Sequence, residues 1–144
     1  MTDRGFTLIE LVMIIVVLGI LAAIAVPRMG GLTESSRVTA TNAEMAMLKR
    51  AIVGNPQVSG GGQYLDVGFE GNVGSPPTRL EDLAVKPDSL SAYNSFTRLG
   101  WNGPYIDSSG SSYLVDAWNA PYRYDPATRT IASVGGSDTL IVAF

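Results

Sequence analysis

Residues 6–26 read FTLIELVMIIVVLGILAAIAV, a long apolar run near the N-terminus. Among its 21 residues only Glu10 carries an ionisable side chain. A helix rises by about 1.5 Å per residue, so this segment would span about 31 Å, which matches a bilayer core of about 30 Å. We therefore expect a helix that is apolar on all sides and long enough to cross a membrane.

Two ordinary explanations of this segment are weak. Residues 23–25 (AIA) have the small-x-small form of a signal peptidase site. The apolar run, however, is longer than the about 7–15 residues of a signal peptide, and the charges of Asp3 and Arg4 in front of it cancel. A plain membrane anchor leaves Glu10 without a role, because a carboxylate that faces lipid costs about 2.5–3.5 kcal/mol. An ionisable group in a membrane segment is therefore a candidate functional residue.

The position of Glu10 favours pairing between copies of the chain. If the chain were cut between Gly5 and Phe6, a new α-amino group would lie four residues before Glu10. Glu10 of one copy could then neutralise the amino terminus of the next. Two charges that neutralise each other in a low-dielectric setting would favour one axial stagger between the copies. Glu10 is thus a predicted assembly residue.

Residues 5–10 (GFTLIE) and the apolar run after them resemble the class III signal of type IV prepilins and type II secretion pseudopilins. The resemblance implies that residues 1–5 are a leader and that a prepilin peptidase cuts between Gly5 and Phe6. It also implies that Phe6 becomes N-methylated. Glu10 would then be the fifth residue of the mature chain, where this superfamily has its glutamate.

A second helical pattern continues the first. Pro27 removes one i to i−4 hydrogen bond and is expected to kink the helix. Residues 27–53 form the amphipathic continuation, and Gly54 is placed to cap its end. The apolar stripe of this part, which is expected to pack on the head, consists of Val38, Thr41, Met45, Leu48 and Ile52.

Residues 54–144 are expected to form a globular head. The glycine-rich residues 55–77 predict a loop, residues 78–81 have the capping-box form before a short helix, and a second weak helix is expected over residues 87–93. The predicted strands, which would form an antiparallel meander on the helix stripe, cover residues 121–124, 130–133 and 139–144. The fold class is therefore α+β, with a long N-terminal helix packed on a small C-terminal antiparallel sheet.

The composition excludes several classes of function. The 144 residues carry a net charge of −3 and no run of Lys or Arg, which argues against a nucleic-acid site. Cys and His are both absent, which excludes thiol nucleophiles, disulfides, the common zinc sites and Ser-His-Asp catalysis. Since no carboxylates are paired at a recognisable spacing either, an enzyme is not expected. Sites for hard cations remain open, because they need only oxygen ligands.

Two aromatic stretches resemble elements of the type II secretion major pseudopilin. Residues 100–106 (GWNGPYI) and 116–124 (DAWNAPYRY) are similar to the WxGPY and DPWGxPYxY elements of that family. Chemically, we interpret them as a rigid aromatic belt that holds loops on the sheet. A carbohydrate or aromatic ligand site is the alternative, although no polar constellation accompanies these residues.

The same resemblance suggests a calcium site in the loop at residues 133–138. Ser133, Gly135 and Asp138 resemble the SxGxD start of the family's calcium loop, with one more residue before the aspartate, and Asp116 or Asp125 would be a distant further ligand. The family's other acidic residues are missing, whereas calcium takes about 6–8 oxygen ligands. A tight Gly-Gly turn between two strands is the alternative.

The resemblance as a whole implies a structural subunit of a type II secretion pseudopilus, with residues 6–26 in the bacterial inner membrane and the head in the periplasm. Copies of the chain and other pseudopilins would form a periplasmic helical fibre, with a prepilin peptidase, an assembly ATPase and a membrane platform as partners. The alternative is a major or minor pilin of a type IV pilus, which forms surface filaments for adhesion, motility or DNA uptake.

Overall fold

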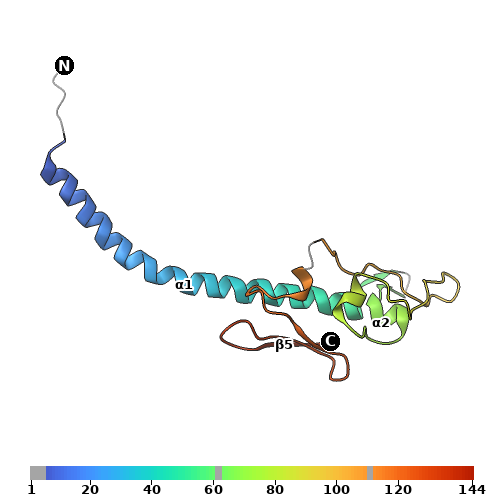
Figure 1. Ribbon diagram of the computed structural model, residues 1–144. Coiled ribbons are helices and arrows are strands. Elements are labelled where there is room, and N and C mark those ends of the chain that lie inside the picture. The colour runs from blue at the N-terminus through green and yellow to red at the C-terminus, as the bar shows by residue number, and fades with distance from the viewer. Residues whose placement is uncertain (1–5, 61–62, 110–111) are drawn as a thin grey trace, which may run out of the picture. The chain divides into compact units, whose positions relative to one another are not determined.

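The computed structural model describes residues 6–60, 63–109 and 112–144, apart from the side chains of residues 25–30, 59, 63 and 64. The chain forms two compact units, Met1–Ser36 and Arg37–Phe144. The first unit holds the first part of helix α1 (Leu8–Val53), and the second unit holds the rest of α1 together with the head (Figure 1).

Helix α1 keeps a helical backbone through all of its 46 residues. Pro27 lies inside α1 and does not end it. The kink expected at Pro27 stays a prediction, because the side chains of residues 25–30 are not described. In the part of the chain that the structure describes, no helix has the length and hydropathy required of a membrane span.

The apolar stripe predicted in the second part of α1 is confirmed. Its buried members are Thr41, Met45, Leu48 and Ile52, and Val38 is half-buried. Met47, on another face of the helix, is 56% exposed. Gly54 ends the helix in the left-handed conformation with a φ of 77°, and its N–H donates to the carbonyl of Arg50 at 2.7 Å. This is the cap that the sequence predicts.

The loop predicted over residues 55–77 is wrong. The segment contains the antiparallel strands β1 (Asn55–Gly60) and β2 (Gln63–Asp66), followed by helix α2 (Gly68–Val73). The glycines allow close backbone approach instead of a loop, since a Cβ on Gly68 would lie 2.6 Å from the carbonyl oxygen of Ile52. Within the described residues the head has five strands rather than about three.

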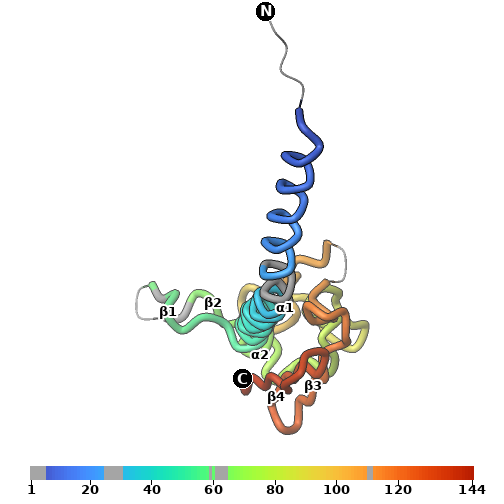
Figure 2. Tube along the Cα trace, turned by 90° about the vertical axis from the view of Figure 1, so that its left-hand side faces the viewer, coloured from blue at the N-terminus to red at the C-terminus, as the bar shows by residue number. Residues whose placement is uncertain are grey.

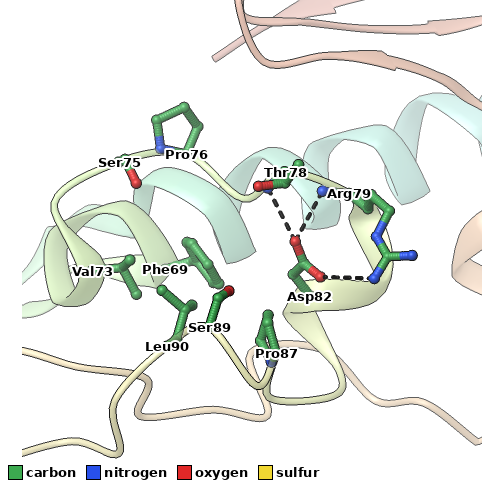
Figure 3. Close-up of a pocket in the computed structure, with 10 residues that line it drawn as sticks. All are labelled: Phe69, Val73, Ser75, Pro76, Thr78, Arg79, Asp82, Pro87, Ser89 and Leu90. Carbon is green, nitrogen blue, oxygen red and sulfur yellow. Dashed lines mark hydrogen bonds and ion pairs between the residues drawn. The ribbon is translucent and has the colours of Figure 1, made fainter.

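The short helix predicted after the capping-box residues is confirmed as one 3₁₀ turn, η1 (Leu80–Leu83), with both leucines buried. The capping carboxylate is that of Asp82 and not that of Glu81. It accepts hydrogen bonds from the backbone N–H groups of Thr78 (3.1 Å) and Arg79 (3.0 Å), at the edge of a small pocket (Figure 3). A second 3₁₀ turn, η2 (Ser112–Leu114), follows later in the chain.

The helix predicted over residues 87–93 is wrong. Ala92 forms an isolated β-bridge with Trp101 instead. The side chain of Asn94 accepts a hydrogen bond from the N–H of Phe96 at 2.9 Å. The backbone N–H of Tyr93 donates to the carbonyl of Trp101 at 3.1 Å, and the N–H of Trp101 donates to the carbonyl of Ser91 at 2.9 Å, so this segment pairs with a later segment instead of forming a helical turn.

The C-terminal meander is confirmed. Strands β3 (Arg123–Asp125), β4 (Thr130–Ser133) and β5 (Leu140–Ala143) form one antiparallel sheet in the order β3-β4-β5. Ile131 of β4 is fully buried and belongs to the same core as Met45, Leu48 and Ile52 of α1. The sheet therefore packs on the stripe of α1, as expected. Figure 2 shows the β1–β2 hairpin and this sheet on different sides of the second part of α1.

Candidate assembly site

Helix α1 begins with two interacting polar side chains, Thr7 and Glu10, at the start of its apolar run. The Oε2 atom of Glu10 accepts hydrogen bonds from the backbone N–H of Thr7 at 3.0 Å and from the hydroxyl of Thr7 at 2.7 Å. In return, the N–H of Glu10 donates to the Oγ1 atom of Thr7 at 3.3 Å. Thr7 is thus the N-cap of α1, and the two residues form a reciprocal capping box.

The capping box explains why α1 begins where it does. The carbonyl of Thr7 accepts the first i to i−4 bond, from the N–H of Leu11 at 3.2 Å. The carboxylate of Glu10 satisfies a backbone N–H that has no partner inside the helix. Glu10 is predicted from the sequence and Thr7 is not, although the spacing Thr-x-x-Glu before an apolar run is the usual signal for this cap.

The apolar side chains of residues 8–24 form what we call the apolar sleeve. Every large apolar side chain of the sleeve is exposed, from 38% at Val12 to 81% at Leu8. Soluble monomers rarely expose a contiguous apolar patch larger than about a few hundred Å². The apolar sleeve is therefore a surface for contact with lipid or with other protein chains.

The predicted processing residues lie at the border of the described chain. Gly5 is outside the described residues, and Phe6 is 69% exposed, just before the cap. The side chain of Pro27 is also outside the description. Cleavage between Gly5 and Phe6, methylation of Phe6 and a kink at Pro27 therefore stay predictions.

The first aromatic stretch packs on α2 and η1. The indole Nε1 of Trp101 donates to the carbonyl of Asp82 at 2.9 Å. The ring of Tyr105 meets the ring of Trp101 edge-on, with centroids 5.8 Å apart, and meets that of Phe69 at 5.5 Å. These contacts hold the loop in place, as expected of an aromatic belt, although its support is helical and not the sheet.

The second aromatic stretch packs on α1. The hydroxyl of Tyr122 donates to the carboxylate of Glu44 at 2.8 Å, and the N–H of Ala117 donates to the Oγ1 of Thr41 at 3.2 Å. Burial, together with the hydrogen bond to Glu44, raises the pKa of Tyr122 far above its usual range. The phenol therefore stays a neutral hydrogen-bond donor.

The candidate calcium residues have separate surroundings. The hydroxyl of Ser133 donates to the Oδ2 of Asp116 at 2.6 Å, whereas Asp125 accepts bonds from backbone N–H groups in the β3–β4 turn, and Asp138 is exposed. Burial raises the pKa of Asp116, but the hydrogen bonds that its carboxylate accepts lower the pKa by more, so it lies below the usual range. Among the described residues, no three acidic side chains are grouped in a way that could hold a metal ion.

The part of the chain that contains the capped start of α1 matches a known family model. Residues 1–26 match the family model of the prokaryotic N-terminal methylation motif. The type II secretion system core protein G of Pseudomonas aeruginosa is 29% identical to this chain over 124 residues, which cover 85% of this chain and 72% of that protein.

Pilus proteins match a shorter part of this chain. A fimbrial protein of Pseudomonas aeruginosa is 46% identical over 49 residues, which are 34% of this chain and 32% of that protein. The type IV narrow pilus major component PilA5 of Thermus thermophilus is 47% identical over 51 residues, which are 35% and 44% of the two chains. The match therefore spans less than half the length of these two relatives. No solved structure gives a significant match to this chain.

Proposed function

We propose that the chain is a structural subunit of a type II secretion pseudopilus that assembles through its apolar sleeve into a periplasmic helical fibre. The extent of the similarity to core protein G carries this proposal. Its 124 aligned residues are more than twice the 46 residues of α1, so the similarity reaches into the head. The alignments with the two pilus proteins, over 49 and 51 residues, are too short to hold both α1 and the head.

The exposed apolar sleeve supports storage of the subunit in the inner membrane, with the head in the periplasm. Lipid tails are as apolar as the helices of neighbouring subunits, so the move from membrane to fibre changes the hydrophobic free energy little. The register between subunits and the work of extraction must therefore have other sources. A membrane platform and its ATPase would supply the work.

The register would come from Glu10. After a prepilin peptidase removes residues 1–5, the amino group of Phe6 in one copy would pair with Glu10 of the next copy at the same depth. Thr7 supports this arrangement, because its two hydrogen bonds to Glu10 hold the carboxylate toward the N-terminal end of α1. That is the end at which the amino group of another copy would lie.

A type IV pilus subunit is the second candidate. One observation favours it: the identity to the two pilus proteins, 46% and 47%, is higher than the 29% to core protein G. The place of the fibres distinguishes the two functions. At native expression, long fibres on the cell surface would support the pilus, and short periplasmic fibres would support the pseudopilus.

Two substitutions of one residue test the assembly mechanism. Glu10→Ala removes both the charge and the cap, whereas Glu10→Gln removes the charge but keeps an oxygen that can accept the hydrogen bonds of Thr7. We expect both variants to be processed and inserted normally and to form no fibres, as judged by electron microscopy and by shearing of cells. Normal fibres from Glu10→Gln would show that Glu10 acts only as a cap, and normal fibres from Glu10→Ala would contradict the whole mechanism.

A further inference from the structure

The loop between β4 and β5 is held by one buried carboxylate. Asp116 is only 4% exposed. Its Oδ2 accepts hydrogen bonds from the hydroxyl of Ser133 at 2.6 Å and from the N–H of Gly135 at 3.1 Å. Its Oδ1 accepts hydrogen bonds from the N–H groups of Trp118 at 3.0 Å and Ala120 at 2.9 Å. One side chain thus joins the 116–120 turn to the end of β4 and to the loop that follows.

The groups around Asp116 are the wrong kind for a cation. Calcium needs about six to eight oxygen lone pairs directed at one point. Here the hydroxyl of Ser133 and three backbone N–H groups direct their hydrogens at the carboxylate, so the space around it presents donors. Within the described residues, every buried side-chain oxygen has a hydrogen-bond partner, so none is left free to bind an ion.

The loop also packs closely on the 116–120 turn. A Cβ on Gly135 would be 2.5 Å from the Oδ2 of Asp116 and 2.8 Å from the Cβ of Trp118. A Cβ on Gly136 would be 2.8 Å from the indole Cζ2 of Trp118. The loop backbone therefore rests directly on this turn, whereas a bound calcium ion would hold its ligands about 2.3–2.6 Å from its own centre.

We propose that the Asp116 carboxylate takes the place of a divalent cation as the group that holds the β4–β5 loop. The 116–120 turn is itself fixed to α1 by the bond from the N–H of Ala117 to Thr41, so the loop is tied to the core without a metal. The head therefore folds independently of calcium. This inference goes beyond the proposed function, because it holds for a subunit of either kind of fibre.

Thermal unfolding of the full chain in detergent micelles tests the proposal. Tryptophan fluorescence would report the midpoint in excess EGTA and in millimolar calcium chloride. We expect the same midpoint in both solutions for the wild-type chain and for Asp138→Asn, the variant of the exposed carboxylate. A rise in the wild-type midpoint on adding calcium that Asp138→Asn abolishes would overturn the proposal.

Variants of the buried pair give the complementary result. Asp116→Asn replaces one acceptor oxygen by an N–H₂ group, so we expect a lower midpoint by the same amount in EGTA and in calcium. Ser133→Ala is the milder variant, because it removes one of the four hydrogen bonds and leaves the carboxylate in place. A midpoint of Ser133→Ala that falls in calcium and is unchanged in EGTA would show that Ser133 is a metal ligand and would contradict the proposal.

Terbium provides a second, direct readout. The indole of Trp118 lies against the loop, so excitation of Trp118 would sensitise the luminescence of a lanthanide ion bound there. We expect no saturable terbium luminescence above that of Asp138→Asn. A saturable signal that disappears in Asp138→Asn would establish a cation site in the loop and would overturn the proposal.

Discussion

Arg129 shows how much one side chain can connect in this head. Its Nη1 and Nη2 atoms lie 2.7 Å and 2.8 Å from the two carboxylate oxygens of Glu70 on α2, and its Nε donates to the carbonyl of Phe144 at 2.8 Å. The guanidinium also lies over the ring of Phe144, 5.2 Å from its centroid. This planar, bidentate geometry is one that Lys could not reproduce. Arg129 thus links the β3–β4 turn to α2 and to the end of β5.

The pair of Glu70 and Arg129 predicts an acid-sensitive contribution to stability. The hydrogen bonds from Arg129 lower the pKa of Glu70 in the folded chain. The contribution is therefore present above the unfolded carboxyl pKa of about 4.3 and is lost as the pH falls through the lower folded value. We expect Glu70→Gln to lower the thermal midpoint at pH 7 and to differ less from the wild-type chain at pH values below about 4.

Glu81→Gln is the control for this experiment, because Glu81 is an exposed carboxylate on η1. It should change the midpoint less than Glu70→Gln does at neutral pH. If the difference between the wild-type chain and Glu70→Gln were equal at both pH values, the ionised pair would not contribute to folding.

At the scale of elements, the packing of α1 on the head depends on two facing glycines. Gly54 caps α1 and Gly68 opens α2, both with a positive φ. A Cβ on Gly54 would lie 2.6 Å from the carbonyl carbon of Val67 and 2.7 Å from the nitrogen of Gly68. The backbones therefore meet where neither residue has a side chain.

Two glycine substitutions separate the cost of the backbone conformation from the cost of crowding. Gly54 and Gly74 both cap a helix with a positive φ, but a Cβ on Gly74 would meet nothing within 4 Å. We expect Gly74→Ala to lower the free energy of unfolding by about 1–2 kcal/mol, from the left-handed conformation alone. Gly54→Ala should lower it by about twice that or more, as measured by urea denaturation in micelles. Equal losses would show that the two backbones can move apart without cost.

The amphipathic part of α1 has one buried and one exposed face. Leu48 is fully buried and its neighbour Met47 is 56% exposed. Leu48→Ala removes buried methyl groups and leaves a cavity, so we expect a loss of about 2–5 kcal/mol in the free energy of unfolding. Met47→Ala should cost less than about 0.5 kcal/mol. Similar losses for the two variants would contradict the burial pattern of this helix.

In the whole molecule, the two units differ in how far they bury their apolar side chains. The head buries its apolar residues on α1, whereas the apolar sleeve of the first unit exposes its own. A single copy therefore folds its head by itself and leaves the sleeve for lipid or for other copies. Folding and assembly accordingly use different parts of one helix.

The intact mass of the protein tests the predicted processing of its N-terminus. For protein purified from its native membrane, we expect the mass of residues 6–144 plus one methyl group, since the N-terminal methylation motif covers residues 1–26. A mass that begins at Met1 would indicate a simple anchored protein. A mass that begins at Val26 would indicate an ordinary signal peptide, and either result would contradict the proposed processing.

Features that repeat along consecutive residues can be predicted from the sequence alone. The long α1, its buried stripe and the C-terminal meander follow from periods of about 3.6 and 2 residues, and Glu10 stands out because it is the single charge in an apolar run. Predictions of local structure are less reliable in segments that contain glycine or asparagine. The glycines of residues 55–77 predict a loop where β1 and β2 form a hairpin, because a single sequence does not distinguish a glycine needed for close packing from a glycine in a loop.

The contacts between groups that are distant in the sequence follow from the packing of the folded chain. Asp116 and Ser133 are 17 residues apart, Arg129 and Glu70 are 59 apart, and Ala117 and Thr41 are 76 apart. No periodicity connects such residues, because their contacts arise when separate elements pack on one core. The candidate calcium loop is an example. The sequence suggests Ser133 and Asp138 as ligands, whereas in the folded chain the hydroxyl of Ser133 donates to the buried carboxylate of Asp116.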